Sequence, residues 1–230
     1  MQLRARTSEA DRRPKVDLVY DELRSAILSG HRAPGEFLDK SELAEEFGVS
    51  RQPIASAIDR LAFDGLAKVV PQHGSFVTKL DRTAIFERFF IRRAIEVELV
   101  LVAAQSISDD VLAQLSHNIR YQQAALDGED LSGFFRLDIE FHDLVHSVQP
   151  NAEAIRILER TTLILERVRR LLLPVAGRPN KTLNEHIAIL DALRKHDSEA
   201  AMTAMRTHIV RVENQFREFV DKRPHLFENG

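Results

Sequence analysis

The chain contains no cysteine among its 230 residues. Without cysteine, neither a disulfide framework nor a thiolate metal site can form. No apolar run approaches the roughly 20 residues that a membrane-spanning helix requires. The first ten residues also lack the apolar core of a signal peptide. We therefore expect a soluble cytoplasmic protein with no membrane partner.

A strong charge of either sign is also absent. The formal net charge is −3 and the pI is about 6.3. Residues 1–80 carry as many lysines and arginines as aspartates and glutamates, so any affinity of this half for a polyanion must come from a local patch. The basic residues of the first fifteen could contact phosphates, but a disordered charged tail fits them equally well. We expect residues 1–14 to form a flexible arm.

Residues 39–64 are the most informative stretch of the chain. They predict two short helices joined by a tight turn at Gly48. A capping box of Asp39 and Glu42 begins the first helix, and Ser50 caps the second. Apolar residues of the second helix recur at three- and four-residue spacing, at Ile54, Ile58, Leu61 and Ala62. A helix-turn-helix places the start of its second helix in the major groove of DNA.

Short strands are predicted on the C-terminal side of this motif. Residues 66–70 and 75–79 are rich in β-branched and aromatic side chains and flank a turn that contains His73 and Gly74. With an amphipathic helix before the motif, this order predicts a winged helix-turn-helix domain over residues 15–80. The wing tip would lie along the minor groove or against a phosphate.

Beyond Leu80 the strand signals vanish and the pattern becomes helical. A loop is predicted from Pro174 to Pro179, followed by a second capping box at Thr182 and Glu185. The predicted helices are 82–105, 108–126, 130–148, 151–173, 182–195 and 197–221. The predicted fold is therefore mainly α, with an antiparallel helical bundle over residues 81–230 following the winged domain.

Four polar residues lie on otherwise apolar helix faces of this bundle. Asp138 and His142 are four residues apart and share one face, and His186 and His208 lie on apolar faces of two later helices. Imidazole and carboxylate ligands suit zinc, nickel, iron or manganese. The pattern alone leaves open that these are hydrogen-bonded core residues. His146, one turn beyond His142, is a rival ligand.

The N-terminal motifs resemble the GntR family of bacterial regulators. Residues 33–38, 43–51 and 73–77 read Ala-Pro-Gly-Glu-Phe-Leu, Leu-Ala-Glu-Glu-Phe-Gly-Val-Ser-Arg and His-Gly-Ser-Phe-Val, in the order and spacing of that family. Where the family commonly has a second reading arginine, this chain has Ala55. The resemblance implies an unusual operator, or weakened DNA binding. The residues expected at DNA are Ser50, Arg51, Gln52, Ala55, Ser56, His73 and Gly74.

The bundle resembles the all-helical ligand domain, called FCD, of FadR-like members of that family. The resemblance is carried by residues 89–96, by the Asp-x-x-x-His spacing of 138–142, and by the segments around His186 and His208. In metal-binding members these positions hold a divalent cation. The resemblance therefore implies a metal at Asp138, His142, His186 and His208, with zinc the first choice and nickel, iron or manganese the alternatives.

An effector contact is implied as well. The resemblance places Arg92 toward the cavity, where a guanidinium suits a carboxylate. Asn184, beside His186, is a lesser candidate for contacting the effector. The alternative is that Arg92 pairs with Glu96 one turn along, on a solvated face.

The implied function is a ligand-responsive transcription regulator of bacteria. A homodimer would bind a near-palindromic DNA operator, because one winged domain reads only a half-site. A small organic acid bound at the metal would relieve repression, the usual outcome in this family. The alternatives are a metal-dependent enzyme and a metal-only sensor. We do not expect an enzyme, since no additional acid or base stands out near the ligands and the winged domain would be unexplained.

Overall fold

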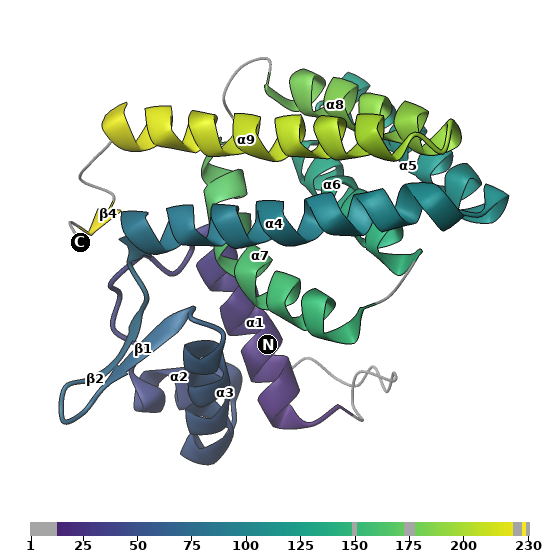
Figure 1. The fold of residues 1–230 in the computed structure, drawn as a ribbon. Helices are drawn as coiled ribbons and strands as arrows, with labels where there is room; N and C mark the ends of the chain where they lie inside the picture. The colour runs from purple at the N-terminus through teal and green to yellow at the C-terminus, as the bar shows by residue number, and fades with distance from the viewer. Residues whose placement is uncertain (1–12, 149–150, 173–177, 223–226, 229–230) are drawn as a thin grey trace. The chain divides into compact units, whose positions relative to one another are not determined.

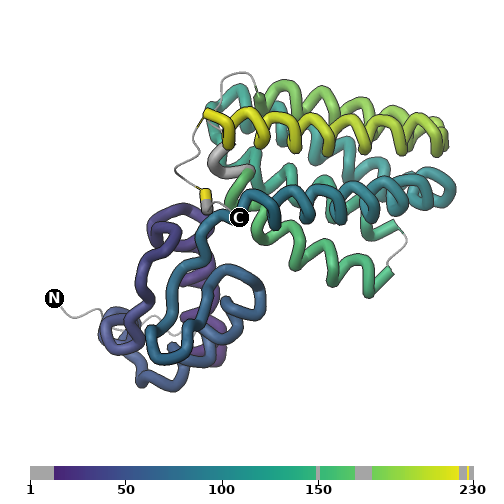
Figure 2. The backbone as a smooth tube through the Cα atoms, turned by 60° about the vertical axis from the view of Figure 1, so that its left-hand side comes forward, coloured from purple at the N-terminus to yellow at the C-terminus, as the bar shows by residue number. Residues whose placement is uncertain are grey.

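The structure is a computed structural model that describes residues 13–148, 151–172, 178–222 and 227–228. It divides the chain into two compact units, with the boundary after Leu80 (Figure 2). Residues 1–12 of the predicted arm and Pro150 and Pro174 of the predicted breaks lie outside the described residues.

The first unit is a helix-turn-helix followed by a two-stranded wing (Figure 1). β1 and β2 are antiparallel, with Ala67 opposite Val77. The elements are α1 (Lys15–Ser29), α2 (Lys40–Phe47), α3 (Arg51–Phe63), β1 (Ala67–Val70) and β2 (Gly74–Val77). The winged helix-turn-helix that the sequence predicts is confirmed.

Local chemistry explains the start and the turn of this motif. The carboxylate of Asp39 accepts hydrogen bonds from the backbone N–H groups of Ser41 at 2.7 Å and Glu42 at 3.0 Å. Gly48 has a φ of 63°, a conformation that glycine adopts without steric cost. One prediction was wrong in detail: Ser50 holds the N-cap position of α3, but its side chain makes no capping hydrogen bond.

The core of this unit joins α1 to α3. Leu23 and Ile27 of α1 and Ile54, Ile58 and Leu61 of α3 are each at most 1% exposed. Removal of such side chains from water is the main stabilising contribution to a small domain, at roughly 1.5–3 kcal/mol for each. This packing fixes α3 against the unit and leaves its opposite face outward.

The second unit is a bundle of helices, as the sequence predicts. α4 and α9 lie side by side and run in opposite directions (Figures 1 and 2). The helices are α4 (Arg82–Ser106), α5 (Asp109–Asp127), α6 (Leu131–Ser147), α7 (Ala152–Leu172), α8 (Arg178–Arg194) and α9 (Ser198–Lys222). Among the described residues, none of the helices is long and apolar enough to cross a membrane.

The predicted start of α8 was wrong. The helix begins at Arg178 rather than at Thr182, so Pro179 lies in its first turn and not in a loop. Proline is tolerated there because a first-turn N–H has no partner within the helix. Thr182 and Glu185 are consequently interior helix residues, 7% and 9% exposed, and not a capping box.

Strand structure also does not end at Leu80 as predicted. The two-residue strands β3 (Leu80–Asp81) and β4 (Phe227–Glu228) form a second two-stranded sheet. Two residues are too few to produce a recognisable alternation of polar and apolar side chains, which is why the pattern gave no sign of them.

Candidate metal centre and DNA-binding surface

Four buried side chains converge inside the bundle. Asp138 and His142 come from α6, His186 from α8 and His208 from α9. All are buried, with His186 completely so. One ligand atom from each residue lies within 4.8 Å of those of the other three. The fold thus brings together the four residues that the sequence nominated, in a group that could hold a metal ion.

Two of these histidines are held by acceptors outside the group. Nδ1 of His186 is 2.9 Å from Oε1 of Gln122 on α5, and Nδ1 of His208 is 2.8 Å from Oε2 of Glu185 on α8. Because both partners are acceptors, each Nδ1 carries a proton, and a ring in its neutral form then has its lone pair on Nε2. The ring of His186 also stacks on Phe141, with centroids 4.2 Å apart.

The third histidine contacts a buried ion pair. Oε2 of Glu96 lies 2.7 Å from Nδ1 of His142, while the other carboxylate oxygen accepts from Nε of Arg92. Nη2 of Arg92 is 3.1 Å from Nε2 of His142. Burial lowers the pKa of His142, so its ring is neutral and Nε2 accepts this hydrogen bond. This histidine therefore shares the tautomer of the other two.

The alternative interpretation of Arg92 is partly correct. Arg92 does pair with Glu96, but the pair is buried rather than solvated, with the side chains 0% and 1% exposed. Burial alone would raise the pKa of Glu96; the charge of Arg92 and the contact with His142 hold it well below its usual value. Glu96 is therefore a buried carboxylate that stays ionised.

The rival ligand His146 belongs to a second, smaller group. Glu96, His142 and His146 also have ligand atoms within 4.8 Å of one another. Oε2 of Glu96 is 3.6 Å from Nε2 of His146. This group offers three donors instead of four, and its carboxylate is already paired with Arg92. With four donors and a carboxylate that is not paired with Arg92, the group with Asp138 is the better metal candidate.

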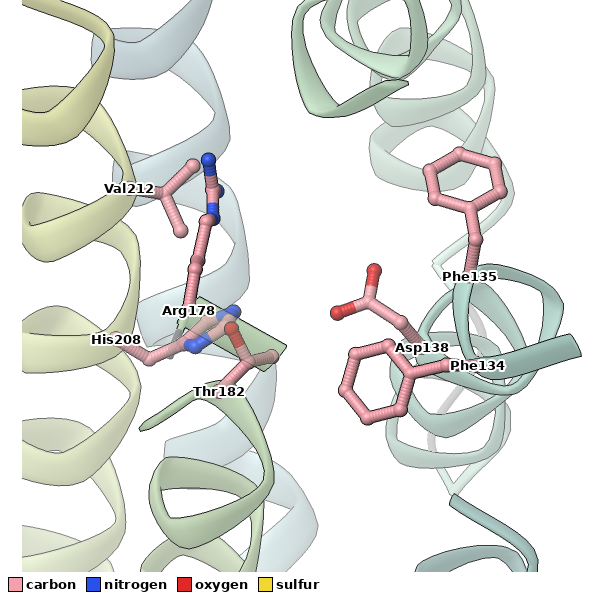
Figure 3. A pocket seen from close by; sticks show the side chains of 7 residues that line it. All are labelled: Phe134, Phe135, Asp138, Arg178, Thr182, His208 and Val212. Carbon is pink, nitrogen blue, oxygen red and sulfur yellow. The ribbon is translucent and has the colours of Figure 1, made fainter. Parts of the chain in front are cut away.

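A narrow pocket opens onto two of the four donors (Figure 3). Phe134, Phe135 and Asp138 form one wall, and Arg178, Thr182, His208 and Val212 face them from the other side. The cavity volume open to a water-sized molecule is about 10 Å³, about the smallest that can hold one water. Arg178, which the sequence reasoning missed, is 5% exposed.

The two residues nominated as effector contacts lie in different surroundings. Asn184 is exposed on α8, and the described lining of the pocket includes neither Asn184 nor Arg92. Arg92 lies against Glu96 and against His142, which is one of the four candidate ligands. Pro179 was the sequence signal that could have revealed Arg178. Proline is common in the first turn of a helix, so Pro179 could have been taken as the start of α8, with Arg178 beside it.

The residues predicted to contact DNA lie on two features of the first unit. At the start of α3, Ser50, Arg51 and Gln52 are exposed, and Ala55 and Ser56 follow one turn later with partial exposure. Because Ser50 makes no capping bond, the N-terminus of α3 keeps donors for an anion such as a phosphate.

The wing tip is held by a ring from the segment before α2. His73 is exposed, and Gly74 has a φ of 106°. A Cβ atom at Gly74 would overlap the ring of Phe37, which lies 5.3 Å from the ring of Phe76. Backbone hydrogen bonds from Leu38 to Ser75 (2.8 Å) and from Val77 to Glu36 (2.8 Å) fix this segment to β2.

Comparison with known families and proteins is consistent with both units. Residues 15–77 match the profile of bacterial regulatory proteins of the gntR family, and residues 87–211 match the FCD domain. The chain is 33% identical over 205 residues to the HTH-type transcriptional repressor RspR of Escherichia coli strain K12, covering 89% of this chain and 90% of that protein. It is 30% identical over 196 residues to the Nta operon transcriptional regulator of Aminobacter aminovorans, covering 84% and 90%.

Solved structures show the same fold. The structure of E. coli McbR/YncC superposes with a TM-score of 0.76 at 18% identity, over 90% of this chain and 99% of that one. A putative GntR transcriptional regulator from Rhodococcus sp. RHA1 superposes with a TM-score of 0.73 at 26% identity, over 89% and 98%. The matched family and the curated relatives RspR and the Nta operon protein are described as regulators of transcription, so this chain is a transcription regulator and not an enzyme. The chain therefore belongs to the GntR family of bacterial transcription regulators, and its FCD domain places it in the FadR-like subgroup.

Proposed function

We propose that this regulator is a repressor that binds a near-palindromic operator as a homodimer and senses a small carboxylate at a divalent metal. Asp138, His142, His186 and His208 would hold the metal, with zinc the first choice and nickel, iron or manganese the alternatives. It would act in the cytoplasm, where operator DNA is located. The observation that carries the proposal is the convergence of these four buried donors within 4.8 Å.

The donor chemistry fits such an ion. The three imidazoles can each present Nε2 to a metal, because Gln122, Glu185 and Glu96 lie against the three Nδ1 atoms. Metal-bound histidines are typically oriented in this way by an acceptor on the other ring nitrogen. When bound, the ion supplies a Lewis acid for an oxygen of the effector. A metal on Nε2 of His142 would take the lone pair that now accepts from Arg92, so this guanidinium would have to turn.

The exposed residues of α3 and the wing support operator binding. Arg51 is exposed at the start of the second helix of the motif, the position from which such helices reach base edges in the major groove. Two copies would read two half-sites, whose spacing depends on how the two winged domains are held. An effector changes repression only if it binds more tightly to one arrangement of the two winged domains than to the other. RspR of E. coli is named a repressor, which supports this direction.

Metal analysis of purified protein tests the site. We expect about one metal per chain in the wild type and much less in a variant with Asp138→Ala and His186→Ala. The matched control is Asp191→Asn, an exposed carboxylate of α8, which should keep the metal. Circular dichroism checks that each variant is folded. A wild type that is folded, metal-free and indifferent to added zinc would refute the site.

Operator binding is tested separately. DNA selected from a random library should bind the wild type and be lost with Arg51→Ala. Release of this DNA by an acid only when metal is present supports the full proposal. Release by the metal alone would instead identify a metal-only sensor, and turnover of an added acid would identify an enzyme.

A further inference from the structure

α5 contributes none of the four candidate ligands, yet it carries two buried amide side chains beside them. Asn118 and Gln122 lie one turn apart on this helix, which packs against both α6 and α8 (Figure 1). Their exposed fractions are 2% and 0%. A buried amide needs hydrogen-bond partners for both its oxygen and its nitrogen, so the partners of these two amides show what they hold in place.

The two amides form a chain of hydrogen bonds from α6 to α8. Nδ2 of Asn118 donates to the backbone oxygen of Leu137 at 3.1 Å, and Nε2 of Gln122 donates to Oδ1 of Asn118 at 2.6 Å. Oε1 of Gln122 lies 2.9 Å from Nδ1 of His186. The chain therefore starts at Leu137, the sequence neighbour of Asp138, and ends at His186.

The direction of this chain is set by its first member. A backbone carbonyl can only accept, so Asn118 turns its NH2 group toward Leu137 and its oxygen toward Gln122. Gln122 then donates with Nε2 and presents Oε1 to His186. Nδ1 of His186 consequently carries a proton, and Nε2, which lies 3.5 Å from Oδ1 of Asp138, is the ring nitrogen on the metal side.

We infer that Asn118 and Gln122 are positioning residues of the metal centre, which fix the plane and the tautomer of His186 and tie it to the backbone beside Asp138. The inference rests on the proposed metal site, because its consequence is a higher affinity for the ion. The amide chain holds ligands of two helices in place before an ion is present. Less ordering is then needed when the ion binds.

Gln122 differs in kind from the acceptors of the other two histidines. Glu185 and Glu96 are carboxylates, and each is paired with an arginine, whereas Gln122 is a neutral amide. Another carboxylate at this buried position would need a compensating charge. An amide needs only hydrogen bonds, which Asn118 and His186 provide. Gln122 therefore acts through orientation and not through charge.

The test separates zinc affinity from stability in the full chain. Competition with a chromophoric chelator measures zinc affinity, and chemical denaturation of the metal-free protein measures the free energy of unfolding. Gln122→Met removes the acceptor at nearly constant shape, whereas Gln122→Glu keeps an acceptor for His186 and loses the donor to Asn118. Gln123→Met, at the exposed glutamine that follows on α5, is the matched control.

We expect Gln122→Met to bind zinc about 10- to 100-fold more weakly than the wild type, the usual cost of changing a residue that orients a metal-bound histidine. Gln122→Glu should bind zinc at least about tenfold more tightly than Gln122→Met, although its lost donor and buried charge lower its stability. Gln123→Met should match the wild type in both measurements. Zinc affinity would thus follow the acceptor, and stability would follow the whole amide chain.

A second readout observes the hydrogen bond itself. In nitrogen–proton correlation spectra of the zinc-loaded protein, Nδ1–H of His186 should give a signal that exchanges slowly with water and is lost in Gln122→Met. Asn118→Leu leaves the acceptor but removes its anchor. Its signal should persist, with a zinc affinity between those of the wild type and Gln122→Met. This variant also provides the test if Gln122→Met does not fold.

Two results would overturn the inference while leaving the metal site in place. One is a folded Gln122→Met, or a folded Asn118→Leu if only that variant is obtained, with the zinc affinity of the wild type. The other is equally weakened zinc binding in Gln122→Met and Gln122→Glu, because position 122 would then act through packing alone. A wild type that takes up no zinc fails at an earlier step, that of the proposed function.

Discussion

Glu185 accepts a hydrogen bond of 2.8 Å from Nδ1 of His208, although the two residues lie on different helices of the bundle. Its other carboxylate oxygen pairs with Arg211 on α9. Glu185 is also the neighbour in sequence of His186. On α8, His186 is thus a candidate metal ligand, and the residue before it, Glu185, orients the candidate ligand His208 on α9.

Replacing Glu185 should therefore lower the affinity for the metal without removing a ligand. We expect Glu185→Gln to lower zinc affinity by about 10- to 100-fold, the typical cost of changing a residue that supports a metal-bound histidine. A competition titration against a chromophoric chelator measures it. Asp191→Asn on the same helix should leave the affinity unchanged. Equal affinities of wild type and Glu185→Gln would show that His208 needs no carboxylate partner.

The elements and four candidate ligands could be predicted from the sequence because each depends on a local signal. Helix periodicity marked α4 to α9, and the four-residue spacing of Asp138 and His142 placed them on one face. That His186 and His208 meet this pair came from the family resemblance. Periodicity puts a residue on an inward face without saying which inward residues of other helices it will meet.

The parts that the sequence could not predict depend on contacts between distant segments. Gln122 touches His186 from 64 positions away, and no spacing rule connects them. Arg92 and Glu96 have the four-residue spacing of a solvated pair, yet packing of the bundle buries both. Arg178 was missed because Pro179 was interpreted as a loop residue, which placed the predicted start of the helix at Thr182, after both residues.

A second prediction concerns how α1 holds the DNA-reading helix. The hydroxyl of Tyr20 donates a hydrogen bond of 2.6 Å to Asp64, the C-cap residue of α3. Tyr20→Phe should lower the free energy of unfolding by about 1 kcal/mol, the usual net value of such a bond. Chemical denaturation measures this. Tyr121→Phe, at an exposed tyrosine of the bundle, is the control and should change little.

The same contact makes stability depend on pH in the alkaline range. Burial, followed by the hydrogen bond to Asp64, raises the pKa of Tyr20 from 10.0 to about 12. Since the folded state keeps the proton more tightly, the contribution of Tyr20 is complete below pH 10 and is lost as pH rises toward 12. Denaturation at several alkaline pH values should show a loss in the wild type that is smaller in Tyr20→Phe. Parallel curves would exclude this role for Tyr20.

A third prediction concerns the wing tip. Gly74→Ala should weaken operator binding and destabilise the first unit, because the added methyl group overlaps Phe37 and φ is 106°. Backbone strain of this kind costs roughly 1–3 kcal/mol. In a Phe37→Ala background the added methyl group meets no ring, but the backbone strain at position 74 remains. Gly74→Ala should therefore destabilise the Phe37→Ala variant, though by less than it destabilises the wild type. Additive effects of the two changes would show that ring and wing tip are independent.

The last prediction concerns Ala55, which stands where the family commonly has a reading arginine. Ala55 is partly exposed on α3, one turn after Arg51, and arginine has nearly the helix propensity of alanine. Ala55→Arg should therefore fold normally and gain a preference for guanine at one position of each half-site, worth about 1–3 kcal/mol of discrimination. Selection from a random DNA library at fixed salt, for wild type and variant, measures it. Ala62→Arg adds the same charge near the other end of α3 and should strengthen binding to all sequences alike, without a new guanine. If the two variants select the same operator, Ala55 does not face the bases, and the unusual residue at this position cannot be the source of operator specificity.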